Sequence, residues 1–138
     1  MPTPEELVRT HLANVGNPTP SDVYAENITV EFPYAPRHHT QRLEGKAAVL
    51  RYVARVAEFF AGYHIPDPKF LPSSDPNLVI TEYAAKATNT ETDLFYHQEY
   101  VAFITVTEGA ITHIREYYDP IRVMVTFGEM DEPGAEPA

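Results

Sequence analysis

The second half of the chain contains three long segments typical of β-strands, and they are joined by very short links. The segments are Leu78–Thr88, Phe95–Thr107 and Ile111–Tyr118. The polar stretch Asn89–Asp93 separates the first two, and Glu108-Gly109 separates the last two. Parallel neighbours need a long crossover, whereas links this short join antiparallel strands. The sequence therefore predicts an antiparallel meander.

Two helical patterns precede the meander. Thr3, Pro4 and Glu6 form a capping-box start, and Gly16 ends that helix. A second helix is predicted from Gly45 to about Ala61. Its apolar stripe is Val49, Val53, Val56, Ala57 and Phe60.

The remaining segments are shorter. We expect a short helix at Thr19–Tyr24, a strand at Ile28–Phe32 and a polar loop over residues 34–44. Two prolines make Tyr63–Leu71 an irregular edge strand. After Asp119-Pro120 the last strand could resume at Ile121–Phe127.

This order separates helices from strands, which indicates an α+β fold with the helices packed on one face of the sheet. The 138 residues fit one domain, which we place at residues 1–127. Residues 128–138 form an acidic tail rich in Pro and Gly, expected to be disordered.

Composition restricts the function. The net charge of −10 argues against sequence-independent binding of nucleic acid, which needs basic side chains. The chain has no cysteine, and it contains no apolar run of the roughly 18 residues that a membrane span requires. Its acidic first residues do not form a secretory signal. We expect a cytoplasmic protein whose partners are small molecules or a second copy of itself.

Several motifs together resemble a known family. They are Leu43–Lys46, Asp75–Asn77, Tyr96–Tyr100 and Gly109–Pro120, the last containing the most telling group, Arg115–Tyr118. In this respect the chain is similar to the SnoaL-like branch of the NTF2-like superfamily, and especially to the phenazine-biosynthesis A/B proteins. The resemblance spans about residues 5–127.

The resemblance implies a cone in which a curved, mostly antiparallel sheet wraps around N-terminal helices and a central pocket. Proteins of this kind are usually homodimers and need no metal or organic cofactor. The enzymes among them transfer protons in isomerisation, cyclisation, dehydration or related reactions. Others bind a ligand or a protein without catalysis.

Two acidic residues are candidate catalytic groups. Glu116 matches a functional glutamate of the phenazine-type proteins, and it shares a strand face with Ile114 and Tyr118. Apolar surroundings would raise its pKa and suit a general acid or base. Alternatively, Glu116 forms surface pairs across strands. Asp119 lies near the acid–base aspartate of SnoaL-type cyclases, although Asp before Pro is also an ordinary turn signal.

The candidate ligand-binding residues are mostly aromatic. Tyr52 falls where the phenazine-type proteins place a pocket histidine, but a tyrosine does not shuttle protons at pH 7. It could instead pack beside the apolar stripe. The full candidate set for substrate binding is Tyr52, Tyr34, Phe32, Tyr100, Ile114 and Tyr118.

Other chemistries receive less support. A ketosteroid isomerase of the usual design is disfavoured because its two catalytic carboxyl positions correspond to Phe32 and a position near Ala102. No histidine pair has the helical spacing of a zinc site, so no metal site is expected. His38 and His39 could cap a pocket mouth or lie in solvent.

The sequence thus leaves three functions open. We favour a cofactor-free acid–base enzyme, of isomerase, cyclase or dehydratase type, acting on a small apolar or cyclic molecule. The alternatives are a non-catalytic ligand-binding module and a protein-interaction domain.

Overall fold

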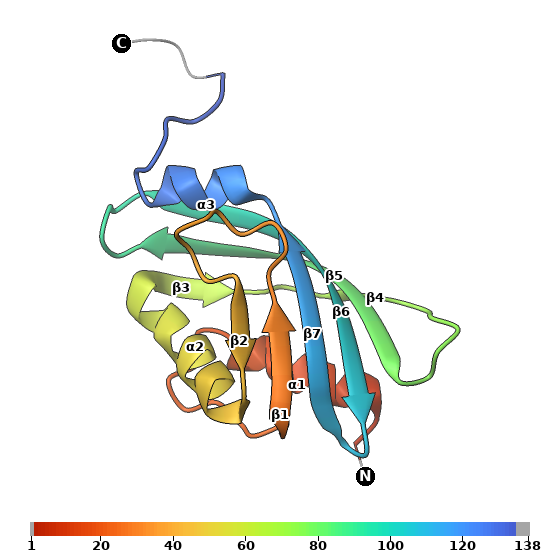
Figure 1. The fold of residues 1–138 in the computed structure, drawn as a ribbon. Helices are drawn as coiled ribbons and strands as arrows, with labels where there is room; N and C mark the ends of the chain where they lie inside the picture. Colours follow the sequence, from red (N-terminus) through yellow and green to blue (C-terminus); the bar gives the residue numbers. More distant parts are fainter. Residues whose placement is uncertain (1, 135–138) are drawn as a thin grey trace.

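A curved seven-stranded sheet is the main feature of the computed structural model, which describes residues 2–134 (Figure 1). The strand order is β2-β1-β7-β6-β5-β3, and β4 pairs with β5 outside this path. The elements are α1 (Pro4–Asn14), β1 (Tyr24–Glu31), β2 (Arg42–Glu44), α2 (Lys46–Phe59), β3 (Phe60–His64), β4 (Lys69–Leu71), β5 (Leu78–Asn89), β6 (Phe95–Thr107), β7 (Ala110–Tyr118) and α3 (Pro120–Thr126).

The predicted meander is confirmed. Strand β5 pairs antiparallel with β6, and β6 pairs antiparallel with β7. Glu108 and Gly109 both have positive φ, at 52° and 80°, as a two-residue hairpin turn requires. The exception to antiparallel pairing is β1, which lies parallel to β7 and so joins the first strand of the chain to the last.

Helices α1 and α2 lie on the same side of the sheet, as the predicted α+β arrangement requires (Figure 1). The N-terminal cap of α1 forms as predicted, since the Thr3 side chain accepts a hydrogen bond from the Glu6 N–H. The apolar face of α1 packs on inward side chains of the sheet. Buried members of this core include Leu7, Val8, Leu12, Ile28, Val49, Ile104, Ile111 and Ile114.

The expected short helix at Thr19–Tyr24 was wrong, because no helix forms there and β1 already begins at Tyr24. The buried Asn14 side chain explains the difference. It accepts from the Ser21 N–H at 2.9 Å and donates to the Ser21 carbonyl at 2.8 Å. These two bonds hold the segment extended.

The idea that a strand resumes at Ile121–Phe127 was also wrong, since α3 occupies this segment. Asp119 is the N-cap of α3, and its carboxylate accepts from the Ile121 N–H at 2.9 Å. Pro120 stands at the first helical position, where its fixed φ favours a helix. The loop expected over residues 34–44 likewise ends in a short strand, β2.

The start of the acidic tail is attached to the domain. The Glu129 N–H donates to the Met124 carbonyl at 2.8 Å, and the Gly128 N–H donates to the Val125 carbonyl at 3.0 Å. Residues 135–138, which belong to the segment expected to be disordered, lie outside the described residues.

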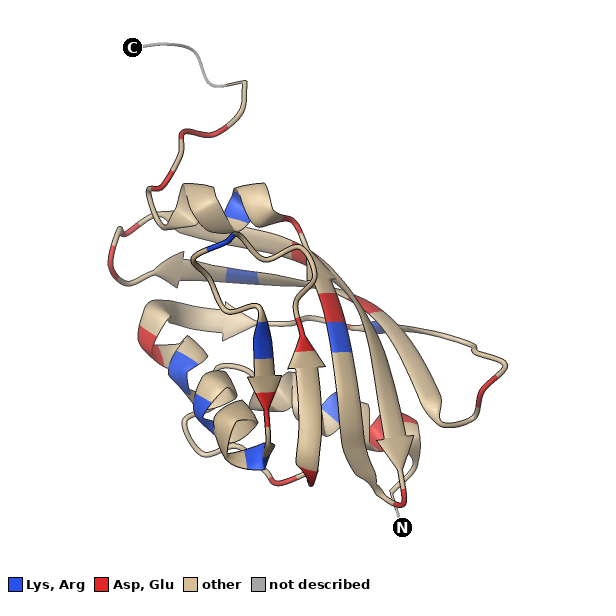
Figure 2. Ribbon diagram, in the orientation of Figure 1, with Lys and Arg blue, Asp and Glu red and all other residues tan. Residues whose placement is uncertain are grey.

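Basic and acidic residues both occur on α2, β2 and β7 (Figure 2). On the outer face of the sheet, Glu31 accepts a hydrogen bond from His113 at 2.6 Å and lies 3.7 Å from Arg115. Within residues 2–134, no helix combines the length and the apolar character needed to cross a membrane.

Candidate active site

A cavity of about 420 Å³ lies between the helices and the concave face of the sheet. This volume suits a small organic ligand. Its wall is predominantly apolar and aromatic, with contributions from β1, α2, β3, β5, β6, β7 and the segment after α3. The lining residues include Phe32, Tyr52, Tyr63, Tyr83, Tyr96, Tyr100, Ile114, Glu116 and Tyr118.

Glu116 projects from β7 into this cavity. Side chains alternate along a strand, so its neighbour Arg115 points to the outer face and pairs with Glu31 there. Arg115 therefore forms the surface pair across strands that was the alternative for Glu116. The Glu116 side chain is instead enclosed by the aromatic rings of the cavity. Burial raises the pKa of Glu116 from 4.5 to about 7, although a hydrogen bond from Tyr83 opposes the rise.

Tyr83 holds the Glu116 carboxylate in place. The Tyr83 hydroxyl donates to Glu116 Oε2, and the Tyr83 ring stacks on Tyr100 with centroids 4.8 Å apart. Tyr83 is itself buried, and burial raises its pKa well above 10. The hydroxyl therefore stays protonated near neutral pH and remains a donor to the carboxylate.

Three more tyrosines form a hydroxyl cluster beside this pair. Tyr63 Oη donates to Tyr100 Oη at 3.2 Å, and the Tyr96 and Tyr100 hydroxyls lie 3.1 Å apart. Burial raises the pKa of all three phenols. This part of the cavity wall thus offers neutral hydroxyl groups to a ligand.

Tyr52 of α2 and Tyr118 of β7 also line the cavity. Phe32 packs on both, with ring centroids 5.4 Å from Tyr52 and 6.3 Å from Tyr118. Ile114 lies in the same wall and is fully buried. Among residues 2–134, neither the Tyr52 nor the Tyr118 hydroxyl has a hydrogen-bond partner, so both can bind a polar atom of a ligand.

Two candidate residues lie outside the cavity. Tyr34 is 61% exposed and packs its ring against Tyr117, on the outer side of the sheet. The Asp119 carboxylate caps α3 and lies 3.5 Å from the Arg122 guanidinium. The geometry of Asp119 is therefore that of an ordinary Asp-Pro turn at the start of a helix.

Sequence reasoning missed Tyr63 and Tyr83 as members of the site. Strand alternation places Tyr83 on the same face as Thr81 and Ala85, and all three are buried in the structure. Only the register of β5 on β6, which pairs Tyr83 with Tyr100, shows that this face meets Glu116.

A curved sheet that encloses helices and a central cavity is the NTF2-like fold. The chain belongs to the SnoaL-like domain family, whose model matches residues 18–114. The YesE protein of Bacillus subtilis, which carries the description uncharacterised, is 34% identical over 108 residues, 78% of this chain and 74% of that protein. A PhzA/B-like protein of Pseudomonas aeruginosa is 24% identical over 80% of this chain and 77% of its own length.

Solved structures agree on the fold. A Bacillus subtilis protein provisionally named an isomerase superposes with a TM-score of 0.77 at 30% identity, covering 91% of this chain and 92% of that one. An NTF2-like protein of Burkholderia xenovorans superposes with a TM-score of 0.73 at 22% identity. The match covers 91% of this chain and 98% of that one. SalBIII is described as an epoxide hydrolase/cyclase-like enzyme in pyran ring formation in salinomycin. It superposes with a TM-score of 0.65 at 25% identity, and the match covers 84% of this chain and 90% of that one.

Proposed function

We propose that this protein is an enzyme that transfers a proton to or from a small organic molecule bound in the cavity, with Glu116 as the general acid or base. One observation carries the proposal: a glutamate side chain is enclosed by aromatic rings in a ligand-sized cavity. A pKa of about 7 suits it to either role at neutral pH, because both protonation states are populated there.

The neighbouring side chains favour a reaction next to a carbonyl group. A general base removes a C–H proton most easily when the resulting negative charge moves onto an oxygen. The unpaired hydroxyls of Tyr52 and Tyr118 are the groups that would donate hydrogen bonds to that oxygen. Isomerisation, cyclisation and dehydration all include such a step.

The wall also limits the substrate. Phe32, Ile114 and the tyrosine rings offer apolar contacts, so a largely apolar, cyclic or polyketide-like molecule fits better than a highly charged one. The isomerase and cyclase names of two structural neighbours are consistent with this substrate class. We further propose that the protein works as a homodimer.

Proton exchange in D₂O tests the proposal without knowledge of the product. Cyclic enones and 1,3-diketones would be incubated with the protein, and loss of C–H signals would be followed by ¹H NMR. We expect exchange by the wild type and a decrease of at least about 100-fold in Glu116→Gln. The rate should follow a titration with an apparent pKa near 7.

Glu82→Gln is the matched control, because Glu82 is an exposed glutamate on β5 that points away from the cavity. It should exchange substrate at the wild-type rate. Full activity of Glu116→Gln would refute the acid–base role. A panel member that binds the wild type tightly and never exchanges would instead indicate a ligand-binding module.

A further inference from the structure

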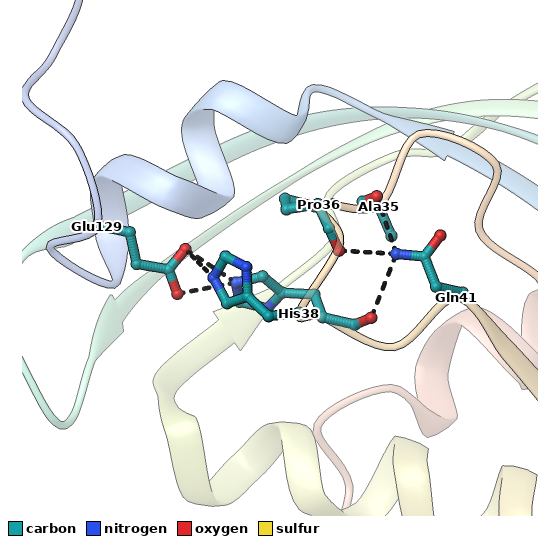
Figure 3. A network of polar contacts seen from close by, with 6 residues as sticks. Ala35, Pro36, His38, Gln41 and Glu129 are labelled. Atoms are coloured by element: carbon teal, nitrogen blue, oxygen red, sulfur yellow. Dashed lines mark hydrogen bonds and ion pairs between the residues drawn. The ribbon is translucent and has the colours of Figure 1, made fainter.

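A second cluster of polar side chains lies at the edge of the cavity, and the proposed proton transfer does not use it. His38 and His39 belong to the loop between β1 and β2, and Glu129 follows α3 (Figure 3). His38 Nε2 lies 2.8 Å from Glu129 Oε2, and His39 Nε2 lies 3.0 Å from Oε1 of the same carboxylate. Both histidines also line the cavity.

The loop that carries the histidines is braced from within. The Gln41 amide donates to the Pro36 carbonyl at 2.7 Å and to the Ala35 carbonyl at 3.0 Å (Figure 3). The His39 N–H donates to the Pro36 carbonyl at 2.9 Å. The His39 ring also packs on Phe127 with centroids 5.3 Å apart. The cluster therefore joins two segments that are each held by the fold.

The donor set is that of a transition-metal site. The two imidazole nitrogens and the carboxylate oxygen lie within 4.8 Å of one another. Ligands bound at about 2.0–2.2 Å from one ion can converge from this spacing with small side-chain rotations. Three protein ligands with a further open position are also the usual composition of a catalytic or ligand-binding zinc site.

Both histidine rings contact the Glu129 carboxylate directly in this structure, and the same three side chains can also bind an ion. The His38 and His39 rings lie 4.7 Å apart, so two protonated rings would repel each other beside a single carboxylate. Two neutral imidazoles and one carboxylate bind a divalent ion without that repulsion.

We propose that His38, His39 and Glu129 bind a first-row divalent transition-metal ion, with Zn²⁺ as the representative, at the edge of the cavity. Nitrogen-rich donor sets favour such ions over Mg²⁺ and Ca²⁺, which prefer oxygen ligands. Because both histidines line the cavity, the open coordination position can take an oxygen atom of a ligand bound there.

Calorimetric titration of the tag-free full chain tests the site, after treatment with a chelator that is then removed by dialysis. We expect one Zn²⁺ ion to bind per chain at pH 7.5, and Mg²⁺ not to compete. His39→Ala and Glu129→Gln should each weaken Zn²⁺ binding by at least about tenfold. Co²⁺ should give a visible absorption band in the wild type that both variants lose.

Two exposed residues outside the cluster provide matched controls, His64→Ala for the histidine variant and Glu132→Gln for the carboxylate variant. Both should bind Zn²⁺ as the wild type does. Absence of saturable binding, or binding that His39→Ala and Glu129→Gln leave unchanged, would overturn the proposal. Glu116→Gln should bind Zn²⁺ normally, which separates this site from the proposed proton transfer.

Discussion

At the scale of single residues, Glu116 experiences two opposing effects. Burial among aromatic rings disfavours the carboxylate and raises its pKa, whereas the hydrogen bond from Tyr83 favours the carboxylate. Burial dominates, so the folded protein holds a proton on Glu116 over a pH range in which the unfolded chain has lost it.

This difference predicts a pH-dependent stability. The pKa of Glu116 is about 7 when folded and about 4.5 when unfolded, so the folded state binds more protons between these values. The free energy of unfolding should therefore fall as pH rises from about 4.5 to about 7, by up to roughly 3 kcal/mol from this group. Urea titrations of the wild type and Glu116→Gln at several pH values measure the difference between the two proteins.

Tyr83→Phe provides a second check on the same balance. Removing the hydroxyl removes the interaction that favours the carboxylate, so the Glu116 pKa should rise further. Carboxyl ¹³C NMR titration would measure the pKa of Glu116 directly in the wild type and in Tyr83→Phe. A wild-type midpoint near the ordinary value of a glutamate would contradict the argument from burial.

Glu116 could be singled out from sequence because strand alternation separates it from Arg115. Its hydrogen-bond partner Tyr83 could not be predicted from sequence, because no local sequence pattern connects it to a residue 33 positions later. Tyr34 shows the converse. Its aromatic character suggested a ligand contact, but its place after the end of β1 turns it to the outer side.

At the scale of elements, the joint between α1 and β1 depends on Asn14. Besides its two bonds to Ser21, the Asn14 amide donates to Tyr24 Oη at 3.0 Å. The same hydroxyl lies 2.7 Å from His11 Nδ1. Burial lowers the pKa of His11 to about 4, so the ring is neutral near pH 7 and the whole joint is uncharged.

Asn14→Ala should lower the free energy of unfolding by about 1–3 kcal/mol, because it removes the hydrogen bonds that the buried amide makes to the Ser21 backbone and to Tyr24 Oη. Chemical denaturation measures this loss. Asn17→Ala is the control and should cost less, because the half-buried Asn17 bonds Thr19 in an exposed turn. Equal effects of the two substitutions would show that the joint does not depend on the buried amide.

The joint also explains which elements could be predicted. Helix α1, α2 and the meander carry long periodic patterns, and these were right. Thr19–Tyr24 has local helix-start signals, but the Asn14 side chain and the pairing of β1 with β7 override them. At α3, a proline was read as an interruption of a strand when it was the first residue of a helix.

At the scale of the whole molecule, an aromatic patch on the outer face of β6 and β7 is a candidate dimer contact. The rings of Tyr34 and Phe103 both pack on Tyr117 there, with centroids 5.1 and 6.1 Å away. We expect light scattering after gel filtration to give twice the 15.6 kDa of one chain.

Phe103→Asp should shift this mass toward that of a monomer, because it would place a charge in the apolar contact. Arg51→Glu, which alters an exposed position on α2, should leave the mass unchanged. A wild type that stays monomeric at all concentrations would exclude this contact.

The cluster of His38, His39 and Glu129 marks the limit of prediction from sequence. Ninety residues separate His39 from Glu129, and the carboxylate lies in a segment whose composition indicates disorder. The charge and proline content of that segment gave no information about its contact, which depends on where α3 ends.

The parallel pairing of β1 with β7 has a consequence for how the chain is made. Strand β1 leaves the ribosome before the other strands of the sheet, yet its inner neighbour β7 emerges after all of them. Until about residue 118 has emerged, one edge of β1 has no partner and the wall that carries Glu116 does not exist. Folding must therefore close a loop of more than 80 residues between paired positions such as Glu31 and Arg115, and the cavity is completed only after β7 has been made.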